Sequence, residues 1–67
     1  MNTKRNQMAE RVRHAVIDAA IRAYDDAGVR GMCEEGRWEV AVDAMRSLDL
    51  ASLVLRADAA APPDARR

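Results

Sequence analysis

The longest hydrophobic pattern in the chain covers residues 6–27 and has the period of an α-helix. On a helical wheel of about 100° per residue, its apolar side chains spread over more than half of the circumference. A surface helix usually shows an apolar stripe only a little wider than 100°. The remaining narrow face carries polar residues at i,i+3 and i,i+4 spacings, typical of a solvated surface with weak ion pairs: His14, Asp18, Arg22 and Asp25. This helix must therefore be covered from two directions, which predicts an oligomer or an obligate partner.

Two parts of this apolar arc are expected to meet different neighbours. One part holds Val12, Ala19 and Ala23, and the other holds Ile17, Ile21 and Tyr24. One of them should meet the second helix and the other a partner, and small residues should allow the closest approach of the backbones. The full predicted interface set is Val12, Val16, Ile17, Ala19, Ala20, Ile21, Ala23, Tyr24 and Trp38.

Three glycines interrupt the pattern and are interpreted as points of helix termination and close packing. The helical phase fails after Ala27, so Gly28 is predicted to end the first helix as a left-handed C′ residue. Residues 30–35 are then expected to form about one short helical turn, with Gly36 as a second stop. The spacing of Gly28, Gly31 and Gly36 matches neither GxxxxGK[ST] nor GxGxxG, which argues against a phosphate-binding loop.

The rest of the chain predicts two further helices and a tail. Residues 37–48 form a second helix whose apolar positions recur at helical spacing, and Asp49 caps a short third helix over residues 50–57. From residue 58 the composition is that of a disordered Ala/Pro/Arg tail. The predicted fold is all-α: residues 1–57 form a single small domain, a helical hairpin with a short third helix, assembled into a dimeric helix bundle.

Residues 34–50, EEGRWEVAVDAMRSLDL, resemble the second helix of a tetratricopeptide-type repeat. The resemblance covers about a quarter of the chain. It implies an αα-hairpin and nothing about a ligand, and only one repeat fits where solenoids need about three. The positions that match the turn glycine, the aromatic, the small contact residue and the two large apolar residues of such a repeat are Gly36, Trp38, Ala41, Met45 and Leu48.

Residues 16–31, VIDAAIRAYDDAGVRG, look like the first helix of TetR-type repressors. In that family a helix-turn-helix follows at once. Here residues 32–48, MCEEGRWEVAVDAMRSL, are acidic and contain no short turn and no basic recognition helix. The DNA-reading function of that family is therefore not transferred to this chain.

Length and composition limit the classes of function. A chain of 67 residues is one domain at most, and it buries only about 60% of the surface that its unfolded form exposes. Its single cysteine excludes an internal disulfide and suits a reducing compartment. Because there is no apolar signal segment and the apolar run at 50–55 is too short for a membrane span, a soluble cytoplasmic protein is expected.

Charge is balanced overall but unevenly distributed. Residues 1–14 carry a net charge of +3 and residues 15–50 a net charge of −4. The basic segment and the acidic middle could meet head to tail between subunits, or the basic segment could bind a polyanion. The second possibility predicts a small nucleic-acid-associated regulator, although no aromatic residues are interleaved with its four cations: Lys4, Arg5, Arg11 and Arg13.

No constellation of residues indicates an enzyme. Cys33 is the one plausible nucleophile, but the acidic residues 34–35 disfavour its thiolate, and it is interpreted as a small buried or half-buried packing residue. His14 and Asp18 make at most half a metal site, so no metal and no cofactor are expected. The carboxylate pairs at 25–26 and 34–35 are interpreted as solvated faces.

The two aromatic residues, Tyr24 and Trp38, are expected in the core, with a subunit or partner interface as the alternative. The function predicted from these patterns is that of a small non-catalytic protein–protein interaction, accessory or regulatory subunit. It would self-associate through its first helix as a homodimer or bind an unidentified protein partner, with no membrane involved. The alternative is the nucleic-acid-associated regulator.

Overall fold

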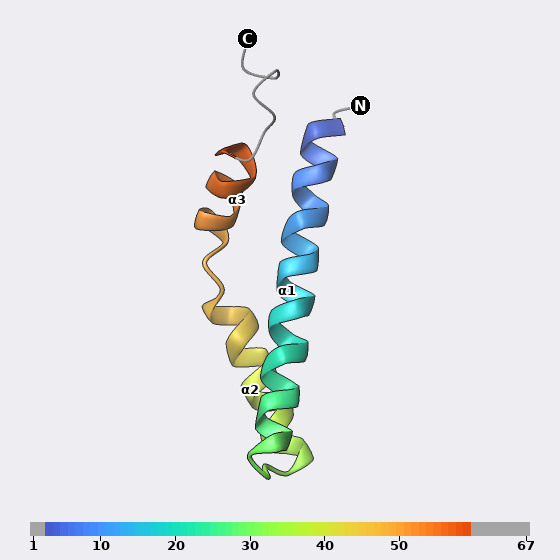
Figure 1. The fold of residues 1–67 in the computed structure, drawn as a ribbon, viewed down its shortest axis with the longest axis vertical. Coiled ribbons are helices and arrows are strands. Elements are labelled where there is room, and N and C mark those ends of the chain that lie inside the picture. The colour runs from blue at the N-terminus through green and yellow to red at the C-terminus, as the bar shows by residue number, and fades with distance from the viewer. Residues whose placement is uncertain (1–2, 60–67) are drawn as a thin grey trace.

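The computed structural model describes residues 3–59, and the side chains of residues 3–56, as three α-helices joined by short connections. The helices are α1 (Thr3–Val29), α2 (Glu34–Ser47) and α3 (Leu50–Ala59), and the described residues form no strand. Figure 1 shows α2 running back along the C-terminal part of α1, and α3 continuing beside the N-terminal part. The expected all-α hairpin with a short third helix is confirmed.

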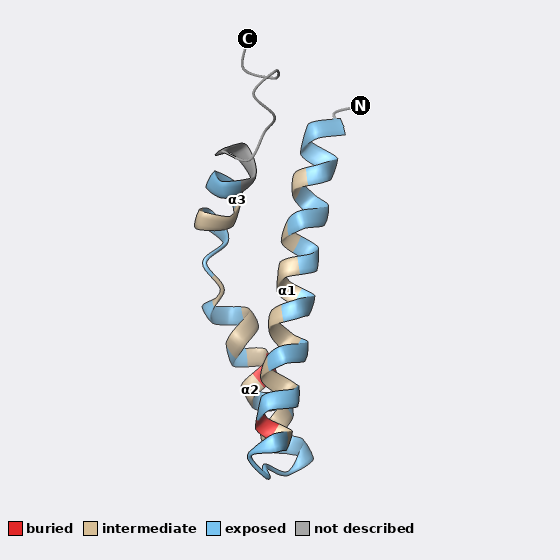
Figure 2. Cartoon of the chain, viewed as in Figure 1, coloured by how far each residue is buried: buried red, intermediate tan, exposed pale blue. Residues whose placement is uncertain are grey.

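Only two helices are present at any level along this arrangement. α1 packs against α2 over most of the contact and against α3 over less of it, whereas α2 and α3 do not pack on each other. Domains normally bury their core between two packed layers. Here the described residues contain two buried side chains, Ala27 at 0% exposure near the end of α1 and Ala41 at 2% in the middle of α2; Figure 2 shows buried segments in red in the lower half of the hairpin. The hairpin thus encloses very little core of its own.

The first helix ends later than the pattern predicts, and the prediction for Gly28 is wrong. α1 continues through Gly28 to Val29, and Gly31 is the glycine with positive φ, at 86°. The N–H of Met32 donates to the carbonyl of Ala27 at 3.0 Å, and the N–H of Gly31 donates to the carbonyl of Gly28 at 3.0 Å. These two hydrogen bonds form a Schellman motif with Gly31 at C′, where the absence of a Cβ removes the steric cost of the left-handed backbone.

The second helix begins earlier than predicted. Residues 30–33 form the connection instead of a helical turn, and α2 starts at Glu34 with Cys33 as its N-cap residue. Gly36 lies inside the first turn of α2, so its predicted role as a helix stop is wrong. Glu34 and Glu35 in that first turn explain the early start, because negative charges near a helix N-terminus interact favourably with the helix dipole.

The third helix begins as predicted and runs further. The Asp49 carboxylate accepts hydrogen bonds from the Ser52 backbone N–H at 3.1 Å and from the Ser52 hydroxyl at 2.6 Å. The hydroxyl hydrogen bond, followed by that of the N–H, lowers the pKa of Asp49 below its ordinary value. α3 continues to Ala59, two residues past the expected end, and the remainder of the predicted disordered tail, residues 60–67, lies outside the described residues. Within residues 3–59, no helix combines the length and the apolar character needed to cross a bilayer.

Candidate interaction surface

The inner face of α1, which packs toward α2 and α3, is built largely from small side chains. Ala27 on α1 and Ala41 on α2 are both buried, and α1 and α2 pack on each other. The remaining inner residues of α1 are half-buried and include five of the predicted interface residues: Val12, Val16, Ala19, Ala20 and Ala23. This is the exposure expected of the part of the apolar arc that meets the rest of the chain.

A contact between Arg37 and Tyr24 fixes α2 on α1. The Arg37 guanidinium lies over the Tyr24 ring, with its Cζ 4.1 Å from the ring centroid, and its Nε donates to the Tyr24 carbonyl oxygen at 3.3 Å. A Cβ on Gly28 would stand 2.7 Å from that Cζ, so the glycine provides the space for the guanidinium. Tyr24 therefore packs on α2 of its own chain, whereas the wheel grouped it with Ile17 and Ile21.

Sequence reasoning did not single out Arg37. One signal could have found it: positions 37, 41, 44 and 48 follow the helical period of the buried side of α2. A charged residue on the buried side of a helix indicates that the aliphatic part of its side chain is packed and that its charged group interacts with a neighbouring residue.

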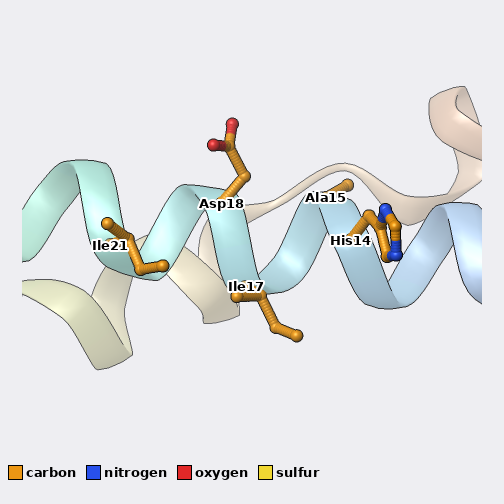
Figure 3. Close-up of a pocket in the computed structure, with 5 residues that line it drawn as sticks. All are labelled: His14, Ala15, Ile17, Asp18 and Ile21. Carbon is orange, nitrogen blue, oxygen red and sulfur yellow. The ribbon is translucent and has the colours of Figure 1, made fainter.

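The outer face of α1 exposes two large aliphatic side chains, Ile17 at 49% and Ile21 at 55%. They line a shallow hollow together with His14, Ala15 and Asp18, and Figure 3 shows Ile17 and Asp18 pointing in opposite directions from the helix. Because all of these residues belong to one stretch of a single helix, the hollow is an open surface and not an enclosed cleft. We define Ile17 and Ile21, with their flanking residues His14 and Asp18, as the outer surface of α1.

Trp38 is not a core residue. Its side chain is 61% exposed, so the expectation of core packing is wrong and the interface alternative stays a prediction. It lies between two shallow hollows on α2. One is lined by Glu34, Glu35 and Glu39, and the other by Glu39, Val42, Asp43 and Arg46.

The candidate chemical residues lie on the exposed surface. Asp18 pairs with Arg22 at 3.0 Å, and Asp26 pairs with Arg30 at 3.1 Å, as expected of solvated faces. Cys33 is exposed, so its interpretation as a buried or half-buried packing residue is wrong. No group of three or more potential metal ligands occurs among residues 3–59.

The four basic residues of the N-terminal segment are exposed and distributed around α1. Lys4 and Arg11 are seven residues apart and share one side of the helix, whereas Arg5 and Arg13 point in other directions. Arg13 pairs with Glu10 at 3.2 Å. These cations therefore give the N-terminal end of α1 a positive charge without forming a single basic stripe.

Comparisons of the chain with protein-family models, with curated proteins and with solved structures found no match in any of the three.

Proposed function

We propose that this chain is a small non-catalytic interaction subunit, with an accessory or regulatory role, that self-associates through its first helix. The observation that carries the proposal is the outer surface of α1: Ile17 and Ile21 remain about half exposed in a hairpin that buries only two residues among those described. Large aliphatic side chains contribute most when they are removed from water, and no further helix within residues 3–59 covers these two.

The size of the expected stabilisation supports a measurable assembly. Burying the exposed half of one isoleucine contributes about 1 kcal/mol, so the four isoleucines of a dimer contribute about 4 kcal/mol, a factor on the order of a thousand in Kd. The lone cysteine, which can form no internal disulfide, is compatible with a reducing compartment and supports the cytoplasm as the place where this subunit acts.

The test is the mass of the full chain in solution. Light scattering coupled to size exclusion should give a mass that rises from the 7.4 kDa of one chain towards twice that value as the concentration is raised to about 1 mM. The double variant Ile17→Lys/Ile21→Lys should shift to the single-chain mass with unchanged helical circular dichroism, because lysine is a good helix former at an exposed position. The matched control Val29→Lys, which changes an 87% exposed valine at the end of α1, should keep the mass of the unmodified chain.

A single-chain mass for the unmodified chain over the whole concentration range would overturn self-association. The alternative of a nucleic-acid-associated regulator is tested by retention of DNA or RNA on a filter. Retention that falls steeply between about 50 and 200 mM salt would favour that alternative.

A further inference from the structure

The two ends of the hairpin carry opposite net charges. We define the basic end as residues 3–14, which contain four cationic side chains and one carboxylate and carry a net charge of +3. We define the turn end as residues 25–39, which contain five carboxylates and two arginines and carry a net charge of −3. α1 begins in the basic end and finishes in the turn end, and the outer surface of α1 lies between them.

We propose that a second copy of this chain occupies the outer surface of α1, packed antiparallel, so that the basic end of each copy lies against the turn end of the other. This inference rests on the self-association proposed above and adds the partner's orientation. Antiparallel packing places opposite charges together at both ends of the pair. Parallel packing would place +3 beside +3 and −3 beside −3, which opposes association.

The positions of the isoleucines set the register of this pair. A two-fold axis midway between Ile17 and Ile21 sets Ile17 of one copy against Ile21 of the partner subunit, as an isologous contact requires. In the same register, Arg11 lies about 3 Å along the helix axis from the level of Asp25 of the partner subunit. Neither Arg11 nor Asp25 belongs to the ion pairs that the chain forms within itself at Glu10–Arg13 and Asp26–Arg30.

A second copy also supplies what one hairpin lacks. Among residues 3–59, α1 packs against α2 and α3 on its inner face, while Ile17 and Ile21 stay about half exposed. A second copy packed on the outer surface of α1 covers these side chains. Because the basic end and the turn end carry opposite net charges, a second copy of the chain matches the charges on both sides of the outer surface of α1.

Spin labels at two sites test the orientation. Cys33 is exposed and is the one cysteine of the chain, so it takes a label at the turn end without any substitution. In the antiparallel pair the two labels should lie about 35 Å apart, because each sits about eleven helical residues from the axis, whereas a parallel pair brings them within about 20 Å. The second site is Asp18→Cys in a Cys33→Ser background, at the level of the axis, where the antiparallel pair predicts about 20 Å or less.

The outcomes separate the orientation from the self-association. A long distance at residue 33 with a short one at residue 18 supports the antiparallel pair. Short distances at both sites would show a parallel pair, and a long distance at residue 18 would place the contact elsewhere; either result overturns this inference while leaving self-association intact. A single-chain mass without any dipolar signal would overturn the proposed function itself.

Charge reversal provides an independent readout that does not use labels. Arg11→Glu and Asp25→Lys should each weaken the dimer about tenfold at low salt, because each turns an attraction at both ends into a repulsion. The double variant Arg11→Glu/Asp25→Lys restores the opposite charges in exchanged positions, so its Kd should return to within about twofold of the unmodified chain. At about 0.5 M salt the differences should collapse. A double variant that binds as weakly as the single variants would contradict the antiparallel register.

Discussion

Replacing Gly31 with alanine should destabilise the chain through its backbone alone. Gly31 has φ of 86°, and no atom lies within 4 Å of the position that a Cβ would take, so a side chain there meets open space. The left-handed conformation costs about 1–2 kcal/mol for a residue with a Cβ. The total stability of a chain of this length is roughly 3–10 kcal/mol, and a loss of this size lowers the melting temperature by about 5–15 °C.

Gly36→Ala is the matched control, because it adds the same methyl group within a helix. Its Cβ would approach the Cε of Met32 at 3.1 Å, and that flexible end can move aside. Alanine also gains about 1 kcal/mol over glycine inside a helix, so Gly36→Ala should raise the melting temperature. Thermal unfolding followed by circular dichroism at one fixed protein concentration measures both effects. Melting temperatures that shift in the same direction, or a Gly31→Ala value within about 2 °C of the unmodified chain, would refute the assignment of Gly31 as the C′ residue.

Three further predictions concern single side chains. Arg37→Met keeps the aliphatic stem but removes the contact with the Tyr24 ring and carbonyl, and it should lower the free energy of unfolding in urea by about 1–2 kcal/mol. Hydrogen bonds from Ser52 lower the pKa of Asp49 in the folded chain below its unfolded value of about 3.9. The stabilisation from these hydrogen bonds is therefore fully present above about pH 3.9 and is lost as the pH falls through the pKa of the folded chain. The carbon chemical shifts of residues 50–56 should then lose helical character below about pH 4, and Asp49→Asn should remove this pH dependence. Trp38→Ala should cost only about 1 kcal/mol in thermal unfolding at low protein concentration, since a side chain that is 61% exposed lacks the burial behind the roughly 3–5 kcal/mol of a core aromatic.

The helices themselves could be predicted because their apolar positions recur with a period that tertiary contacts do not change. The end of α1 could not be placed as well, because Gly28 and Gly31 both satisfy the local requirement for a C′ residue. Gly28 lies instead beside Arg37, nine residues further along the sequence, whose guanidinium occupies the space where a Gly28 Cβ would be. A wheel analysis of one helix contains no information about that neighbour.

The outward position of Ile17 and Ile21 was one of the two arrangements that the sequence left open, and the structure places them outside. The positions of Tyr24 and Trp38 were harder to predict from the sequence, because a large aromatic side chain is equally compatible with a core and with an interface. Tyr24 is half-buried, and its ring packs against the guanidinium of Arg37. On α2 it is Ala41 that is buried, whereas Trp38 is 61% exposed.

The distribution of large and small side chains is itself an argument for a second contact. The inner face of α1 uses mostly alanine, which lets helices approach closely but removes little apolar area from water, whereas a fully buried isoleucine contributes about 1.5–3 kcal/mol. A chain that had to be stable alone would place its largest aliphatic residues on that inner face. This one keeps Ile17 and Ile21 on the opposite side, and holds its hairpin together with a tyrosine–arginine contact and a glycine turn. Covering the outer surface of α1, as proposed above, would bury the large aliphatic side chains that the inner face lacks.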